Sequence, residues 1–404
     1  MKLRDYQIEI ANKAVEVLTN KYIVYLSMQV RTGKTLTSLE TAKIYGAKNV
    51  LFLTKKKAIK SILKDYETFG YTFGLTVVNN ESLHLTEGNF DLIICDEHHR
   101  CGTYPKPNKV TKLIRLRYSH LPMIFLSGTP YPESYSQIYH QFWISDNSPF
   151  RSWSNFYKFA QVFVNITQKH FGYAKINNYS DCNIDKVSPL MKDYFITYTQ
   201  QQAGFTTEVK ENILRVRLKE STYNLINRLR KDKVIQGKEH NVLGDTGVKL
   251  MSKLHQLYSG TVKFECGETK VIDTSKALFI KEKFKEKIAI FYKFKAELDA
   301  IKEVYNNDIT EDLEEFNNSN KSIALQIVTG REGISLSNAK YLVYYNIDFS
   351  ALSYWQSRDR LTTMDRLTND IFWIFSEGGI EDKVYKAVSN KKDYTLSVFK
   401  QDGF

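Results

Sequence analysis

Short runs of apolar residues recur along the first 130 residues, separated by longer segments with the spacing of amphipathic helices. The runs cover residues 22–26, 49–54, 75–78, 91–95 and 123–127. Continuous apolar runs of this length are typical of strands that are buried on both faces of a parallel sheet, with helices between them. The pattern therefore predicts an α/β sheet in the first part of the chain.

A second region with the same alternation follows a different middle segment. Residues 131–205 are rich in aromatic residues, Asn and Ser, and we expect helices and loops that cover the first sheet. Residues 221–234 have the pattern of a charged helix. Four further apolar runs follow at 287–292, 322–328, 341–345 and 371–375. The chain is thus expected to hold two α/β domains in series, residues 1–206 and 207–404.

Polar residues directly follow several predicted strands of the first domain. They are Thr32 to Thr35, Thr54 to Lys57, Asp96 with Glu97, and Ser127 to Pro130. Parallel α/β sheets bind ligands at the carboxyl ends of their strands. The sequence therefore predicts a polar site at this edge of the first sheet.

Gly33, Lys34 and Thr35 lie between the first predicted strand and a predicted helix. Unpaired backbone N–H groups at a helix start can hold phosphate, the lysine can reach the terminal phosphates, and the threonine hydroxyl can bind Mg²⁺. The full phosphate-loop pattern asks for glycine at position 28, where this chain has Met28. For these residues taken alone, an ordinary helix start is the alternative interpretation.

Asp96 and Glu97 strengthen the phosphate-loop interpretation because they end a buried apolar strand further along the chain. A carboxylate at a strand end can hold Mg²⁺, and its neighbour can activate an attacking water molecule. The two signals in this order make ATP hydrolysis with Mg²⁺ the working hypothesis.

Composition adds a preference for a polyanionic partner. The formal net charge of the 404-residue chain is +12, and 25% of its residues are charged. No apolar run reaches the length of a membrane span, so we expect no membrane partner and a cytoplasmic location. The four cysteines lack C-x-x-C spacing, which indicates neither a zinc site nor a disulfide framework.

Motifs in both halves together resemble those of one known family, the superfamily-two helicases and translocases. The chain is most like their Swi/Snf-like branch (DEAD/DEAH-box type), in the compact form common in bacteriophages. The motifs are Leu3-Arg-Asp-Tyr-Gln7, Val30-Arg-Thr-Gly-Lys-Thr35, Asp96-Glu-His-His99, Ser127-Gly-Thr-Pro130, Ser275-Lys276, Gly330 to Leu336, and Gln356 to Arg360. This resemblance implies two tandem RecA-like parallel-sheet lobes with an interlobe ATP cleft, in the host cytoplasm if the chain is phage-encoded.

The resemblance also implies the residues that bind and hydrolyse ATP. Gln7 would read the adenine base, and Thr35 and Asp96 would hold Mg²⁺. The other positions that match ATP-binding motifs are Arg31, Thr32, Gly33, Lys34 and Gly333. The catalytic positions are Lys34, Asp96, Glu97 and Arg360.

Further matching positions concern the nucleic acid. Coupling of hydrolysis to nucleic acid is implied for His99, Ser127, Thr129 and Gln356. Contacts with the nucleic-acid strand are implied for Thr54, Lys55, Lys56, Thr329 and Arg331. Because such contacts are mainly to phosphates, binding is expected to be salt-sensitive and largely independent of sequence.

The last motif departs from the family pattern Q-x-x-x-R-x-x-R. Gln356 and Arg360 fit it, but the second arginine falls on Thr363. If the segment is helical, Arg366 returns to nearly the same face and could partly replace the missing arginine. The alternative is that Arg360 acts alone and that Arg366 caps or pairs with an acidic neighbour.

The sequence thus predicts an ATP-dependent DNA helicase or translocase, with single-stranded, duplex or branched DNA as partner and a monomer favoured. The alternatives are an RNA-dependent ATPase and a clamp that binds ATP and nucleic acid without hydrolysis. We interpret His84 and His98 as structural. Asp370, Glu381 and Lys383 have a nuclease-like spacing, but the strand that carries it is already explained by the second lobe.

Overall fold

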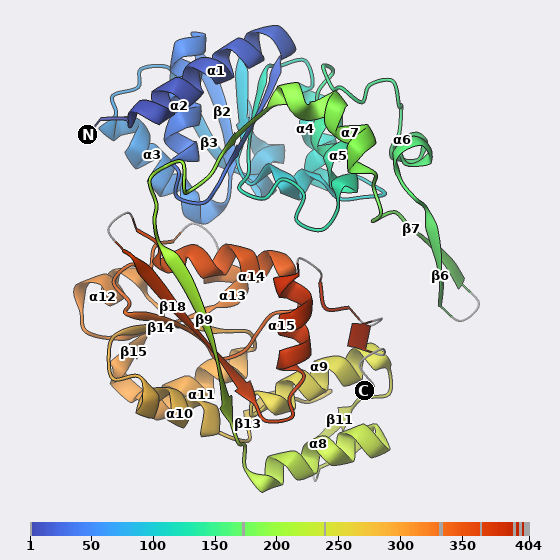
Figure 1. Cartoon of the computed structure of the whole chain (residues 1–404), viewed down its shortest axis with the longest axis vertical. Coiled ribbons are helices and arrows are strands. Elements are labelled where there is room, and N and C mark those ends of the chain that lie inside the picture. The colour runs from blue at the N-terminus through green and yellow to red at the C-terminus, as the bar shows by residue number, and fades with distance from the viewer. Residues whose placement is uncertain are drawn as a thin grey trace. The chain divides into compact units, whose positions relative to one another are not determined.

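The computed structural model describes residues 2–171, 174–237, 240–330, 334–363, 366–390, 393–395 and 398–399. The chain divides into two compact units, Met1–Phe205 and Thr206–Phe404, one residue before the boundary that the sequence predicts. Each unit contains a six-stranded sheet in which all neighbouring strands run parallel (Figure 1). The predicted α/β class with two tandem RecA-like sheets is confirmed.

The sheet of the first unit has the strand order β3-β2-β4-β5-β1-β8. Its strands are β1 (Ile23–Met28), β2 (Asn49–Thr54), β3 (Gly74–Asn79), β4 (Leu92–Cys95), β5 (Met123–Leu126) and β8 (Phe195–Tyr198). The five strands predicted from apolar runs are confirmed, with ends shifted by at most two residues.

The sixth strand, β8, was not predicted, because residues 131–205 were expected to form only helices and loops. β8 pairs with β1 at the edge of the sheet and has four residues, none of them fully buried. A short edge strand needs no continuous apolar run, so its pattern is weak. The same region also contains the antiparallel hairpin β6 (Thr167–Phe171) and β7 (Ala174–Asn178).

Helices cover both faces of this sheet. Alternate residues of β1 face opposite sides: Val24 and Leu26 pack in one hydrophobic cluster, and Ile23 and Tyr25 in another. The first cluster includes residues of α1 (Asp5–Lys21), α2 (Lys34–Tyr45) and α3 (Ile59–Thr68). The second includes residues of α4 (Lys109–Tyr118), α5 (Ile138–Trp143), α6 (Phe156–Phe163) and α7 (Ile184–Met191).

The sheet of the second unit has the order β15-β16-β14-β17-β18-β9. Its strands are β9 (Glu208–Val216), β14 (Ile288–Tyr292), β15 (Ile309–Thr310), β16 (Ser322–Gln326), β17 (Tyr341–Tyr344) and β18 (Thr368–Ser376). The four predicted strands are present, but the run 322–328 ends as a strand at Gln326, and α13 (Ile327–Gly330) follows. The two edge strands, β9 and β15, were not predicted.

Helices also cover both faces of the second sheet. Residues of α10 (Ser275–Lys283) and α11 (Lys295–Tyr305) pack in one cluster. The other cluster includes residues of α8 (Glu220–Asp232), α9 (Gly247–Tyr258), α12 (Leu313–Asn318), α14 (Ala351–Arg358) and α15 (Glu381–Ser389). Two small hairpins lie beside α8 and α9: β10 (Val234–Gln236) with β11 (Asn241–Leu243), and β12 (Thr261–Lys263) with β13 (Thr269–Val271). Among the described helices, each is too short or too polar to cross a lipid bilayer.

A buried ion pair ties α10 to the start of α15. Lys276 Nζ lies 2.8 Å from Glu381 Oε1, and both side chains are fully buried. Lys276 belongs to the motif Ser275-Lys276, and Glu381 belongs to the nuclease-like spacing. Since Glu381 is buried and pairs with Lys276, this carboxylate stabilises the fold of the second unit.

We predict that Lys276→Met destabilises the protein by about 3–5 kcal/mol, because Glu381 is then left as a buried charge without its cation. The variant with both Lys276→Met and Glu381→Gln should recover part of this loss. Urea unfolding of the full chain measures both. The matched control is Lys321→Met, which removes an exposed pair with Glu315 and should cost at most about 1 kcal/mol. Equal costs for the two lysines would contradict the prediction.

Candidate nucleotide-binding site

The loop between β1 and α2 has the backbone conformation of a tight phosphate-binding turn. Arg31 and Gly33 both have positive φ, +65° and +80°, and α2 begins directly after Gly33, at Lys34. The hydroxyl of Thr32, which is fully buried, donates to the carbonyl of Gln29 at 2.8 Å. The loop therefore presents the N-terminus of α2, the end of a helix that favours an anion, at the carboxyl end of β1.

Lys34 reaches back over this loop. Its ammonium group donates to the carbonyls of Met28 and Gln29 at 2.9 and 3.2 Å. Both acceptors are neutral backbone oxygens. A phosphate oxygen would accept a stronger, charge-assisted bond from the same group. The geometry fits the predicted contact of Lys34 with the terminal phosphates, which stays a prediction.

The start of α1 is attached to the same loop. Tyr6 donates its hydroxyl hydrogen to the carbonyl of Thr32 at 3.1 Å, and Gln7 Nε2 donates to the carbonyl of Gly33 at 3.4 Å. Gln7 Oε1 accepts from the backbone N–H of Arg4 at 2.9 Å, and only 4% of Gln7 is exposed. Here Gln7 positions the phosphate loop, and its predicted contact with adenine stays a prediction.

Asp96 and Glu97 follow β4, and their neighbours fix the first carboxylate from two sides. Thr54, at the end of β2, donates its hydroxyl hydrogen to Asp96 Oδ2 at 2.8 Å. The backbone N–H of Glu97 donates to Asp96 Oδ1 at 2.9 Å. Both carboxylates are partly buried, and they border a cavity of about 430 Å³, so solvent reaches them.

The carboxylate pair suits a divalent cation. Burial raises the pKa of Asp96 above its ordinary value, and the adjacent Glu97 carboxylate raises it further, while Lys34 acts in the opposite direction. A raised pKa means that the Asp96 anion lacks compensating positive charge. Carboxylate and hydroxyl oxygens are the hard ligands that Mg²⁺ prefers. Asp96 therefore fits the predicted Mg²⁺, and the contribution of Thr35 stays a prediction.

His99 connects the carboxylate pair with the loop after β5. Its Nδ1 atom lies 3.3 Å from Glu97 Oε2 and 3.0 Å from Ser127 Oγ. The backbone N–H of Thr129 donates to the same Ser127 oxygen at 3.1 Å. Gly128 lies against the phosphate loop, since a Cβ atom there would be 3.4 Å from the carbonyl oxygen of Met28. Three of the predicted motifs thus meet at one edge of the sheet.

His98, beside His99, has a structural environment. It is buried, its Nε2 bonds the carbonyl of Gln141 at 2.8 Å, and its ring stacks on Phe125. Burial lowers the pKa of His98 to about 3, so the ring is neutral at pH 7. This environment agrees with the structural interpretation of His98.

In the first unit, three residues are predicted to contact nucleic acid, and two of them are accessible. Lys55 is half-buried and Lys56 is exposed, at the start of a short 3₁₀ turn. Thr54 is different, because only 1% of it is exposed and its hydroxyl serves Asp96. The Thr54 hydroxyl therefore positions the Asp96 carboxylate, and the predicted contact of Thr54 with nucleic acid stays a prediction.

In the second unit, Gln356 lies in the last turn of α14 and Arg360 in the 3₁₀ turn that follows, and both are nearly buried. Arg360 Nε donates to the carbonyl of Gln356 at 3.0 Å, and Nη1 donates to the carbonyl of Ile334 at 3.2 Å. Thr329 is exposed and donates its hydroxyl hydrogen to the carbonyl of Gln326. Arg331 and Gly333 lie outside the described residues.

The helical premise for Arg366 is wrong. The helix α14 ends at Arg358, a 3₁₀ turn covers Asp359–Leu361, and Thr362 is no longer helical, with ψ +126°. Arg366 donates to the carbonyls of Thr368, Ser337, Ala339 and Lys340. These four acceptors are backbone carbonyls, and not the acidic neighbour that the alternative named. They hold the guanidinium within its own unit, so Arg366 fixes a loop, and the role of Arg360 stays a prediction.

Glu211 on β9 is a positioning residue that the sequence analysis missed. Its carboxylate accepts from the hydroxyl of Tyr354 at 2.8 Å and from Trp373 Nε1 at 2.8 Å, and it pairs with Arg358 Nη2 at 2.8 Å. Tyr354 and Arg358 both belong to α14, the helix that carries Gln356. An acidic residue in an unpredicted edge strand gives no signal in the sequence that could identify this role.

Comparisons with known proteins agree with the nucleotide-binding part of this site. The model of the family described as "Type III restriction enzyme, res subunit" matches residues 1–73. This match confirms the resemblance to superfamily-two helicase domains for the segment that contains Gln7 and the phosphate loop. No curated protein matches the sequence.

Two solved structures are similar over the whole chain. The Sulfolobus solfataricus SWI2/SNF2 ATPase core in complex with dsDNA is 15% identical, and the alignment covers 99% of this chain and 92% of that one, with a TM-score of 0.44. The ATPase core domain from the same organism is 14% identical, and the alignment covers 100% and 91%, with a TM-score of 0.44.

We predict that Gly33→Ala damages the phosphate loop for two separable reasons. The left-handed backbone at φ +80° costs an L-residue about 1–2 kcal/mol, and the added Cβ would overlap Gln7 Nε2. Gly46 offers a matched control, because it has φ +81° and open space around its Cα. Gly33→Ala should therefore lower the free energy of unfolding more than Gly46→Ala does.

A Gln7→Ala background identifies the overlap as the cause of this difference. There, Gly33→Ala should lower the free energy of unfolding no more than Gly46→Ala does. If the extra cost of Gly33→Ala persists without the Gln7 side chain, the contact between α1 and the loop is not its origin.

Proposed function

We propose that this chain is an ATP-dependent DNA helicase or translocase, which couples ATP hydrolysis to movement along DNA or to its remodelling. The observation that carries the proposal is the convergence of Lys34, the Asp96–Glu97 pair and Ser127 at one sheet edge. A lysine that can bind phosphate beside a carboxylate pair is the equipment of phosphoryl transfer to water.

Each of these residues has a distinct part in the proposed reaction. Lys34 offsets the charge of the terminal phosphates, and Thr35 and Asp96 would hold Mg²⁺, which neutralises charge on the phosphate oxygens. Glu97 orients the attacking water and accepts its proton. Arg360 is the proposed contribution of the second unit, since a guanidinium stabilises the charge of the transition state.

His99 supports the proposed coupling of hydrolysis to nucleic acid. Its ring bridges Glu97, which acts on water, and Ser127, which belongs to the loop after β5. A shift of that loop would therefore reorient the ring next to the catalytic carboxylate. Thr129 and Gln356 keep their proposed coupling roles on the basis of the family resemblance.

The choice of DNA rests on the resemblance to the Swi/Snf-like branch, and the charge of +12 suits any nucleic acid. An RNA-dependent ATPase is the alternative enzyme. It is separated from the proposal by comparing the stimulation of ATP turnover by duplex DNA, single-stranded DNA and RNA. A clamp that does not hydrolyse ATP is disfavoured by the presence of both Asp96 and Glu97.

We predict that Lys34→Ala and Glu97→Gln both abolish DNA-stimulated ATP turnover, but at different steps. Lys34→Ala removes a charge that binds the phosphates, so nucleotide affinity should fall. Glu97→Gln keeps the shape of the side chain and the Asp96 site, so Mg²⁺–ATP should still bind with nearly normal affinity. Turnover is measured by phosphate release, and affinity by fluorescence titration.

The control for these variants is Glu81→Gln, an exposed change near the same cavity that should leave turnover unchanged. Near-normal turnover in Lys34→Ala would refute the assignment of the phosphate loop. Loss of nucleotide binding in Glu97→Gln would show that Glu97 supports the fold of the site.

We also predict that replacing both Lys55 and Lys56 with Ala weakens DNA binding equally for all sequences. The slope of log affinity against log salt should fall by roughly one phosphate contact for each lysine. Lys186→Ala with Lys192→Ala is the matched control, because both lysines are exposed beside α7 and their loss changes the net charge equally. Equal slopes for the two double variants would place the DNA elsewhere.

A further inference from the structure

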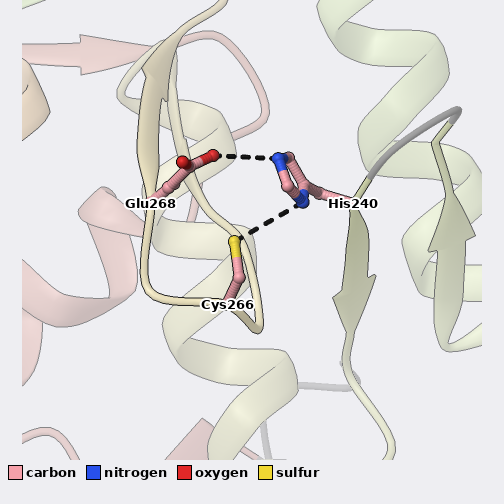
Figure 2. Close-up of side chains that lie close together, drawn as sticks. All are labelled: His240, Cys266 and Glu268. Atoms are coloured by element: carbon pink, nitrogen blue, oxygen red, sulfur yellow. Dashed lines mark hydrogen bonds and ion pairs between the residues drawn. The ribbon is translucent and has the colours of Figure 1, made fainter.

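Three side chains with metal-binding atoms meet in the second unit, between two small hairpins. His240 precedes β11, and Cys266 and Glu268 lie in the turn between β12 and β13 (Figure 2). One hairpin thus supplies the imidazole, and the other supplies the thiol and the carboxylate. The figure shows Cys266 and Glu268 directed toward opposite nitrogens of the His240 ring.

The distances within this cluster are short. Cys266 Sγ lies 3.6 Å from His240 Nδ1, and Glu268 Oε2 lies 2.9 Å from His240 Nε2. One ligand atom from each residue can be chosen so that all three lie within 4.8 Å of one another. Metal–ligand bonds of about 2.0–2.3 Å place tetrahedral ligand atoms roughly 3.3–3.7 Å apart. The sulfur and Nδ1 already have this spacing.

The backbone holds the two hairpins together without the side chains. The N–H of Glu265 donates to the carbonyl of Asn241 at 3.2 Å, directly beside His240. The N–H of Phe264 donates to the carbonyl of Glu268 at 2.8 Å, which closes the second turn. Only the Glu268 side chain, which is 67% exposed, has to move in order to bring its oxygen to an ion on Nδ1.

We propose that His240, Cys266 and Glu268 bind a divalent transition-metal ion of the Zn²⁺ type, through His240 Nδ1, Cys266 Sγ and a Glu268 oxygen. A thiolate, an imidazole and a carboxylate together suit Zn²⁺, whereas Mg²⁺ prefers oxygen ligands alone. Three protein ligands leave the fourth position to water. The ion links the hairpins β10–β11 and β12–β13 and stabilises them against opening.

The spacing in the sequence hides this site. His240 and Cys266 are 26 residues apart, and Cys266 has no second cysteine near it. The cysteine spacing therefore argues only against a zinc site of the C-x-x-C type. It does not bear on a site whose ligands come from two hairpins. Without an ion, His240 and Glu268 form an ion pair, and Cys266 lies beside it. A metal titration distinguishes this ion pair from the proposed metal site.

The test titrates the metal-free full-length protein with Co²⁺ in excess Mg²⁺, which occupies the proposed nucleotide-linked site. Wild type should bind one Co²⁺ with thiolate charge-transfer absorption and the ligand-field bands of a tetrahedral site, and one equivalent of Zn²⁺ should displace it. Cys266→Ser should abolish the charge-transfer absorption. His240→Ala and Glu268→Gln should raise the dissociation constant at least about tenfold, the scale on which even indirect partners of a metal act.

Glu265→Gln is the matched control, because this carboxylate lies in the same turn but pairs with Lys249 and Lys253. It should bind Co²⁺ as wild type does. Thermal unfolding gives a second measurement: Zn²⁺ should raise the Tm of wild type and of Glu265→Gln, but not that of His240→Ala. The proposal is overturned if wild type binds neither ion at micromolar concentrations, or if Cys266→Ser shows the same charge-transfer absorption as wild type.

Discussion

The parallel pairing of β1 with β5, and of β5 with β4, is the constraint on which the candidate nucleotide site depends. Parallel strands end at the same edge, so the loops after these strands become neighbours although they are distant in sequence. The phosphate loop follows β1, the Asp96–Glu97 pair follows β4, and the Ser127 loop follows β5. β2 pairs with β4, and for the same reason Thr54 reaches Asp96. A sheet of mixed direction would scatter these groups over two edges.

In the second unit, the edge strand β9 positions the helix α14 through one charged side chain, Glu211. β9 pairs with β18 over nine residues and carries Glu211, which bonds two side chains of α14 and the indole of Trp373. Arg358 compensates the carboxylate, so the charge can lie inside a cluster of aromatic rings. The orientation of α14, and with it the positions of Gln356 and Arg360, thus depends on one acidic residue. That dependence explains why Arg358, despite its place in the last motif, faces the core of its own unit.

The sequence predicted strands correctly where a continuous apolar run marks them. It failed for edge strands that have no such run. Nine strands were evident from their apolar runs, eight central ones and the edge strand β3. The motif residues Lys34, Asp96 and Ser127 were assigned to the sheet edge where they lie. The edge strands β8, β9 and β15 carry polar residues or are very short, so no run marks them. The helical environment predicted for Arg366 was wrong, and His240 was not singled out. Both residues have partners in other segments of the chain that only folding brings near.

The phosphate loop is also bonded to the last residues of the first unit. Gln29 N–H donates to the carbonyl of Tyr198, and Gln200 donates from its backbone to Gln29 Oε1 at 2.7 Å and from Nε2 to the carbonyl of Val30 at 3.0 Å. The second unit begins only a few residues later, at Thr206. Any rearrangement of the loop around bound phosphates must keep or break these bonds. Three hydrogen bonds thus tie the loop to the end of the first unit, and a short covalent path leads from there to Thr206. Tyr6 and Gln7 of α1 bond the same loop.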